Sequence, residues 1–211
     1  IFVSDVNGDN AIIVVPGAGA EMTVAELEAS RDAIASSRVF VTQLEQTLAV
    51  ARRGLEIARE AGVTTVFNPA PATAIPDDMY PLCDYVIPNE SEATMLTGLA
   101  VSTLDEARKA GDALLAKGVK TALITLGGRG SLLHSAGMSE VIAPVNAGKV
   151  VETTGAGDSF VGAFATALAD GMAPADAARF GSAAAGISVT RAGTAPSMPA
   201  RTEIERLLAR G

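Results

Sequence analysis

The sequence is poor in the residues that mark disulfide-bonded, zinc-binding and nucleic-acid-binding proteins. It contains one cysteine, Cys83, so no disulfide can form within the chain, and one histidine, so no cluster of Cys and His ligands is available to zinc. Its 211 residues carry a formal charge of −8, and no basic run is longer than two residues, as at Arg52 and Arg53. Binding to nucleic acids or to an anionic membrane surface depends on clustered positive charge, so we expect neither.

The sequence also lacks any apolar run of the ~18 residues that a membrane-spanning helix needs. No signal-peptide pattern opens it, and we expect a protein of the reducing cytoplasm. Because it opens at Ile1, inside a predicted strand and without an initiator Met, we expect a further segment before it. The composition is 48% hydrophobic and 19% charged, which is typical of a globular α/β protein with one sizeable core.

Hydrophobic periodicity predicts strands that alternate with helices. Asn7-Gly8 between two apolar runs predicts a hairpin over residues 1–15. Further strands are predicted at 39–42, 63–67, 85–87 and 121–126, followed by a meander at 131–134 and 141–144. Helices are predicted at 23–36, 46–61, 103–117, 156–170, 174–189 and 201–210. This alternation predicts an α/β fold with a mostly parallel sheet and helices on both faces.

The strongest chemical signal is the segment from Glu152 to Phe160, ETTGAGDSF, which leads into an apolar helix. Gly155 and Gly157 allow a tight turn, and the first turn of a helix leaves N–H groups without intrahelical acceptors. These donors and the helix dipole attract anions. Asp158 could accept a proton from a hydroxyl while the amides hold a transferring phosphoryl group. The alternative is that this segment only makes a turn and caps the helix.

Other polar side chains follow the predicted strands, where open α/β sheets bind ligands. They are Gln43 and Glu45, Asn68, Asn89 and Glu92, and the turn 127–130. Each has a structural alternative: Glu92 could complete a capping box, Asn68 could end a strand, and Glu45 could be a solvated loop charge. Outside this edge, we expect His134 at the surface, Cys83 as a packed thiol, and tight helix packing at 182–186.

Three segments resemble the PfkB carbohydrate kinases. Residues 151–160 resemble the C-terminal signature of the family, Pro88-Asn89-Glu90-Ser91-Glu92 its Asn-x-x-Glu motif, and residues 125–130 (TLGGRG) its nucleotide-contacting loop. Residues 68–72 (NPAPA) and 43–45 (QLE) are most similar to the ribokinase branch. The resemblance runs in order over essentially the whole chain.

The resemblance implies a ribokinase-like fold, with residues 1–16 as part of a β lid and 17–211 as an α/β nucleotide-binding and catalytic domain. It implies ATP-dependent phosphorylation of D-ribose to ribose 5-phosphate, with Mg²⁺ and K⁺, in a homodimer. Fructose, a ketodeoxy sugar acid or a nucleoside are alternative substrates. In another class, the chain could be an inactive nucleotide- or sugar-binding module or fragment.

The resemblance also assigns roles to residues. Asp158 is the implied base, with Gly155, Ala156 and Gly157 forming the anion hole, and Glu45 approaches the sugar. Implied nucleotide contacts are Asn89, Thr125, Leu126, Gly127, Gly128, Arg129, Gly130 and Gly157, and Glu92 acts indirectly on Mg²⁺. The implied K⁺ site involves Glu152, Thr154, Ser188, Arg191, Gly193 and Ser197, largely through backbone carbonyls. Many family members have Asp where Glu152 stands, and the N-terminal part with the Gly-Gly sugar-binding segment is expected to be missing here.

Overall fold

The computed structural model describes residues 2–4, 10–12 and 14–210, which form two compact units. The first, the sheet unit, contains residues 16–126 and 132–141. The second, the helical unit, contains the described part of residues 1–15 together with 127–131 and 142–210. None of the helices in the described ranges is long and apolar enough to span a membrane.

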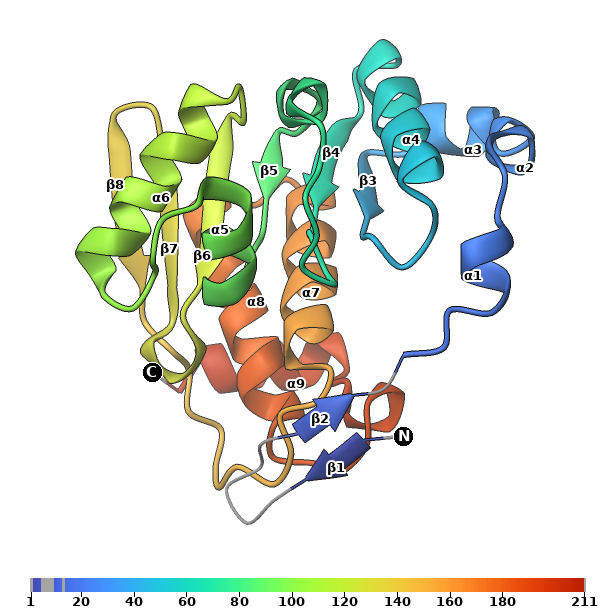
Figure 1. Ribbon diagram of the computed structural model, residues 1–211. Helices are drawn as coiled ribbons and strands as arrows, with labels where there is room; N and C mark the ends of the chain where they lie inside the picture. Colours follow the sequence, from blue (N-terminus) through green and yellow to red (C-terminus); the bar gives the residue numbers. More distant parts are fainter. Residues whose placement is uncertain (1, 5–9, 13, 211) are drawn as a thin grey trace. The chain divides into compact units, whose positions relative to one another are not determined.

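A six-stranded sheet has its strands in chain order, β3-β4-β5-β6-β7-β8 (Figure 1). The strands are β3 (Val39–Thr42), β4 (Thr64–Phe67), β5 (Tyr85–Val86), β6 (Thr121–Thr125), β7 (Ser131–Ser135) and β8 (Met138–Ile142). The first four run parallel, with Val39 opposite Thr64, Val66 opposite Tyr85, and Tyr85 opposite Thr121. Their carboxyl ends therefore meet at one edge of the sheet, which confirms the predicted mostly parallel arrangement.

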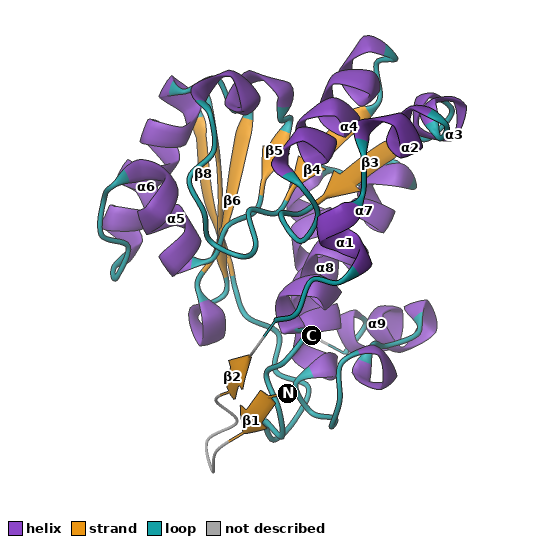
Figure 2. Ribbon diagram, turned by 45° about the vertical axis from the view of Figure 1, so that its right-hand side comes forward, coloured by secondary structure: helices purple, strands orange, loops and turns teal. Residues whose placement is uncertain are grey.

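Helices connect these strands and share a core with them. Helix α4 (Leu48–Glu60) packs against β3 and β4, and α5 (Glu90–Thr97) and α6 (Leu104–Ala116) pack against β6 (Figure 2). The core combines strand residues such as Phe67 and Ile124 with helix residues such as Leu55 and Leu114, all of them fully buried. Capping boxes start three helices of this unit, which are α2 (Val24–Glu28), α5 and α6. The remaining elements of the unit are α1 (Ala18–Glu21), α2 (Val24–Glu28), α3 (Arg31–Ala35) and the 3₁₀ helix Asp77–Leu82.

The helical unit contains α7 (Ala156–Ala169), α8 (Pro174–Ser188) and α9 (Arg201–Leu208), with short 3₁₀ turns at Gly127–Arg129 and Ala195–Ser197. Strands β1 (Phe2–Ser4) and β2 (Asn10–Ile12) pair antiparallel in this unit. Helices α7 and α8 pack closely through small residues. A β-carbon at Gly181 of α8 would lie 3.0 Å from the Phe160 carbonyl of α7, and residues 182–184 of α8 are at most 7% exposed. The expectation of tight helix packing at 182–186 is confirmed.

Several local predictions need correction. The single helix expected over 23–36 is two helices, α2 and α3, because the Ser30 N–H donates to the Leu27 carbonyl, three residues back, and breaks the helical pattern. The second meander strand begins at Met138 instead of 141, and the sequence pattern did not predict α1. The antiparallel hairpin is confirmed by β1 and β2, whereas its Asn7-Gly8 turn lies outside the described residues.

The expectation that His134 lies at the surface is wrong. Its residue is 8% exposed, and both ring nitrogens have partners, Nε2 at 2.8 Å from Asp112 Oδ1 and Nδ1 at 3.1 Å from Ser139 Oγ. The imidazole therefore ties α6 to β7 and β8. Cys83 is fully buried, as expected for a packed thiol, and burial raises its pKa to about 12.

Candidate functional site

The N-terminus of α7 is built around Gly155. This residue is the N-cap and has the left-handed conformation φ 79°, ψ 1°, which favours glycine. The Ala156 N–H donates to the Thr153 carbonyl at 3.2 Å and closes the turn. The Ser159 N–H donates to the Gly155 carbonyl at 2.9 Å. The Gly157 N–H has no acceptor within the described part of the chain. The sequence GAG thus produces a helix start that presents a backbone donor.

Gly157 and Asp158 are exposed at this helix start. A β-carbon added to Gly157 would meet no atom within 4 Å, although φ at this residue is not positive. Asp158 follows in the first turn of α7 and is exposed. A carboxylate and a backbone donor therefore stand side by side at the surface of the helical unit, the arrangement that proton abstraction next to a bound phosphate requires.

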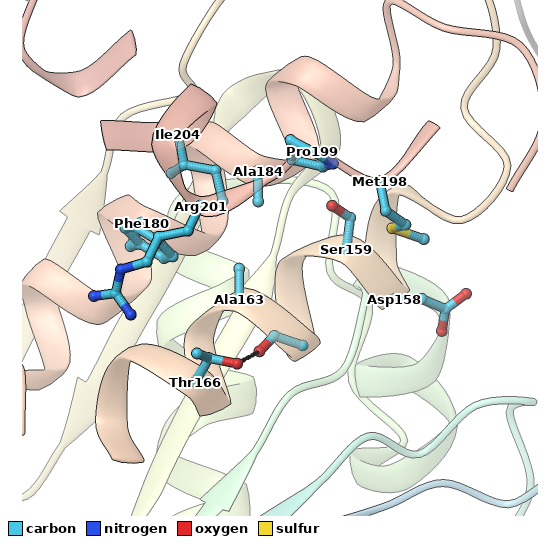
Figure 3. A pocket seen from close by; sticks show the side chains of 11 residues that line it. Asp158, Ser159, Ala163, Thr166, Phe180, Ala184, Met198, Pro199, Arg201 and Ile204 are labelled. Carbon is cyan, nitrogen blue, oxygen red and sulfur yellow. Dashed lines mark hydrogen bonds between the residues drawn. The ribbon is translucent and has the colours of Figure 1, made fainter. Parts of the chain in front are cut away.

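A pocket of about 290 Å³ begins at Asp158 and continues along α7 (Figure 3). Asp158 and Ser159 line it at the helix start, and Phe180 and Ile204 line it further along. Its floor contains Gly162 and other small residues of α7 and α8. The sequence pattern did not predict this pocket, because its walls come from three helices and from the segment of Met198 and Pro199 before α9.

Glu152 is a buried carboxylate in the segment before α7. Its residue is 7% exposed, and the Val151 and Glu152 N–H groups both donate to the Val189 carbonyl, at 2.7 and 3.2 Å. Its Oε2 accepts from the Gly193 N–H at 2.9 Å, whereas Oε1 is buried without a hydrogen-bond partner among the residues that the structure describes. A buried carboxylate oxygen without a partner is costly, so a cation at this point would stabilise it.

Four other residues of the implied cation site, Ser188, Arg191, Gly193 and Ser197, lie at the end of α8 and in the bend that follows it. Thr154 is buried just before α7. The Ser188 hydroxyl donates to the Ala185 carbonyl at 2.9 Å and the Ser197 hydroxyl to the Thr194 carbonyl at 2.7 Å. Arg191 Nη2 lies 2.5 Å from Glu203 Oε1. These side chains thus serve local contacts, and backbone oxygens remain as the ligands that a monovalent cation would use.

In the sheet unit, Asn89 and Glu92 form the capping box of α5. The Glu92 N–H donates to Asn89 Oδ1 at 2.9 Å, and Glu92 accepts from the Asn89 N–H at 2.8 Å and from its Nδ2 at 2.9 Å. Glu92 is 7% exposed, so the structural alternative for this motif is realised. The Thr125 N–H donates to the Pro88 carbonyl at 2.9 Å and brings the end of β6 next to this motif.

Asn68 ends β4 and also connects the neighbouring strand ends. Its Nδ2 donates to the Ile87 carbonyl at 2.7 Å, and its Oδ1 accepts from Gln43 Nε2 at 2.9 Å. Leu126, after β6, is 3% exposed and buried in the core, so it would offer only its backbone to a ligand. Glu45 is exposed in the loop after β3.

The turn Gly127–Arg129 belongs to the helical unit. Gly127 to Arg129 are exposed, and the Gly130 N–H donates to the Gly127 carbonyl at 3.1 Å. A β-carbon at Gly130, where φ is 89°, would lie 2.1 Å from the Ile142 carbonyl, so only glycine fits there. The turn therefore presents backbone at a fixed place beside residue 142.

Three or more His, Cys, Asp or Glu side chains do not gather anywhere in the ranges 2–4, 10–12 and 14–210. These residues offer no ready cage of side-chain ligands for a divalent metal. A divalent ion bound by these residues would have to take further ligands from a substrate, as Mg²⁺ commonly does with phosphates.

The model of the pfkB family carbohydrate kinases matches residues 1–201. The chain belongs to this family. Among curated relatives, this pfkB family chain is 38% identical over 197 residues to ribokinase of Haemophilus influenzae, covering 93% of this chain and 64% of the relative. It is 39% identical over 203 residues to ribokinase of Mus musculus, covering 93% and 62%. The chain thus spans just under two thirds of the length of the curated relatives it matches.

Solved structures show the same fold. The chain superimposes on a ribokinase of Arabidopsis thaliana complexed with ribose and ATP with a TM-score of 0.86 at 32% identity, covering 98% of this chain and 67% of the other. For ribokinase of Giardia lamblia the TM-score is 0.89 at 27% identity, covering 100% and 70%. The expected ribokinase-like fold and the family assignment are confirmed.

Two contacts of this pfkB family chain join residues that are far apart in the sequence. Glu152 and Gly193 are 41 residues apart, and Gln43 and Asn68 are 25 apart. Both pairs unite loops that hydrophobic periodicity does not describe. The NPAP run after β4 was the only hint that Asn68 does more than end a strand.

Proposed function

We propose that the protein is an ATP-dependent sugar kinase that phosphorylates a primary hydroxyl of D-ribose to give ribose 5-phosphate. The observation that carries the proposal is Asp158 in the first turn of α7, after the left-handed Gly155 and beside the open Gly157. Relatives named ribokinase at 38% and 39% identity, and a ribokinase solved with ribose and ATP, support this choice of substrate.

Asp158 takes the proton of the sugar hydroxyl while the hydroxyl oxygen bonds to the γ-phosphorus and the bond from phosphorus to the ADP oxygen breaks. The backbone N–H groups at residues 155–157 stabilise charge on the transferring phosphoryl oxygens. Because the Ala156 N–H is shared with Thr153, the Gly157 N–H is the principal donor. Positioning and charge stabilisation supply most of the rate in such a transfer.

The nucleotide is held by Asn89, by Thr125 and Leu126, and by the turn 127–130, where exposed glycines admit close contact with backbone. Mg²⁺, when bound, neutralises charge on the phosphates. Glu92 fits an indirect role toward this ion, since both of its oxygens accept hydrogen bonds from Asn89. Through these hydrogen bonds Asn89 would keep the side chain of Glu92 oriented at the strand end.

Residues 152, 154, 188, 191, 193 and 197 hold K⁺ in this proposal. The unpartnered Oε1 of Glu152 fits a cation, and carbonyl oxygens of the bend can replace the hydration shell of a large monovalent ion. K⁺, when bound, supplies positive charge next to the turn of Gly155. A β-carbon at Gly155 would lie 3.5 Å from Thr194, which shows how closely the bend and the turn are packed.

We further propose that the protein acts in the cytoplasm as a homodimer and that its two subunits pair through the β1–β2 hairpin. Support for pairing comes from Val14 and Val15 after the hairpin, which are 56% and 85% exposed. An isolated two-stranded hairpin is marginally stable in water, so a partner surface would stabilise it. Residues 1–16 as a lid and 17–211 as the catalytic domain complete the proposal.

An ADP-release assay over a panel of acceptors tests the function. The panel contains D-ribose, deoxyribose, fructose, a ketodeoxy sugar acid and a nucleoside, and deoxyribose is included because a deoxyribokinase of Salmonella typhi is 32% identical. We expect the highest kcat/KM with D-ribose. A higher kcat/KM with another acceptor would show that D-ribose is not the preferred substrate. ATP binding without ADP release on any acceptor would instead identify a nucleotide-binding module.

A further inference from the structure

Asn68 lies in the middle of a hydrogen-bonded row that joins the ends of β3, β4 and β5. It donates to the Ile87 carbonyl and accepts from Gln43 Nε2, and its residue is only 8% exposed. The orientation of the amide is determined, because a carbonyl can only accept and therefore requires Nδ2 on the Ile87 side. A buried amide satisfied on both sides connects these strand ends rigidly.

The row ends on the loop of residues 43–47, between β3 and α4. Leu44 N–H donates to the Ala70 carbonyl at 2.8 Å, so the chain after Asn68 holds this loop a second time. Gln46 Nε2 lies 2.6 Å from Thr42 Oγ1 and folds the loop back on the end of β3.

Gly19 supports the same loop from α1. A β-carbon at residue 19 would lie 2.9 Å from the Glu45 carbonyl oxygen, so any larger residue would push on the backbone of Glu45. The Glu45 side chain is exposed and forms no hydrogen bond or ion pair with the part of the chain that the structure describes. A carboxylate on so fixed a backbone is pre-organised for a ligand.

We propose that Asn68 is a positioning residue for Glu45 and acts on it through Gln43. The proposal rests on the proposed function only in taking the sugar as the ligand of Glu45. Asp in place of Asn68 has the same shape but cannot donate to the Ile87 carbonyl. Asn68→Asp therefore breaks the row without changing the size of the side chain.

Hydrogen exchange of the whole chain tests the positioning without relying on activity. In Asn68→Asp we expect exchange at residues 43–47 to rise by at least about tenfold, with α6 unchanged. Asn146→Asp is the matched control, since its Oδ1 accepts from the Gly148 N–H at 2.9 Å, which a carboxylate can also do. Unchanged exchange at 43–47, or an equal rise over the whole sheet unit, would overturn the proposal. If Asn68→Asp does not fold, Gln43→Glu tests the same bond from the less buried side.

Kinetics then test the connection to the sugar. We expect Asn68→Asp to raise the KM for the sugar about tenfold, with the KM for ATP within about twofold. In a Glu45→Gln background the same change should add nothing, because both act on one contact. If the effects of the two substitutions on the KM for the sugar multiply in the double variant, the proposal is contradicted. A wild type that phosphorylates no sugar would refute the proposed function, while the exchange result would still decide the role of Asn68.

Discussion

Glu152 and Gly193 are joined by a hydrogen bond of 2.9 Å from the backbone N–H of Gly193 to Oε2 of Glu152. Oε1 is buried and has no hydrogen-bond partner in residues 2–4, 10–12 and 14–210. One side chain thus fixes the bend after α8 and still offers a charged oxygen to an ion.

We expect K⁺ to raise kcat more than Na⁺ does, and more than it raises the affinity for ATP. The response should be weaker than in Glu152→Asp, where both oxygens are free to approach the ion, and lost in Glu152→Gln, which has no charge. Steady-state titrations with KCl and NaCl at constant ionic strength measure it. Glu205→Gln, a change at an exposed acid of α9, is the control. No response to K⁺ in either the wild type or Glu152→Asp would remove the cation site.

Asp158→Asn should lower kcat by about 10²–10⁴, the range typical of a lost general base. The amide keeps the shape of the side chain, so the affinity for ATP should stay within a few-fold. Asp176→Asn, in the first turn of α8, is a matched control that should retain activity. Near-normal turnover of the Asp158 variant would show that another group takes the proton.

Gly157→Val should abolish turnover with only a small loss of thermal stability. The added side chain meets no protein atom near its β-carbon, and it occupies the space in front of the helix start that the phosphoryl group needs. Gly157→Ala should have a smaller effect of the same sign. The measurements are kcat and the midpoint of thermal unfolding, and full activity in the Val variant would make this turn a mere connector.

Asp84 should make stability depend on pH in the acid range. Burial raises the pKa of its carboxyl, but hydrogen bonds from Lys120 and the Thr65 N–H outweigh burial and hold the pKa below its ordinary value. A group with a lowered folded pKa stabilises the fold above its unfolded pKa, near 3.8, and this stabilisation is lost as pH falls through the folded pKa.

Asp84→Asn should therefore cost on the order of 2 kcal/mol at neutral pH and flatten the acid limb of the stability profile. Urea unfolding between about pH 2 and 7 measures both effects. Asp105→Asn is the control, because the side chain of Asp105 is 84% exposed. An unchanged acid limb in Asp84→Asn would contradict the assignment.

The sequence predicted the elements whose signal is local. Hydrophobic periodicity over 103–117 predicted α6, and the apolar pattern at 121–126 predicted β6. It failed where tertiary contacts decide. The break at Ser30 and the burial of His134 against Asp112 depend on neighbours that no local pattern describes.

In the candidate site too, some residues have a local signal in the sequence and others depend on contacts between distant segments. The ETTGAGD segment could be singled out from the sequence, because its glycines and acid stand together at the start of a predicted helix, where an anion can bind. The roles of Asn68 and of Gly193 arise from contacts between distant loops, which only coordinates display. The motif of Asn89 and Glu92 was ambiguous in sequence because a capping box and a ligand site use the same residue types.

The order of strands in the sheet has a consequence for how the chain is made. From β3 to β8, each strand pairs with the strand synthesised just before it. A growing sheet of this kind can extend at one edge as the ribosome releases the chain, and no strand in this series has to wait for a later partner. The closing loops between neighbours are short compared with the chain, which keeps the entropy lost in each pairing step small.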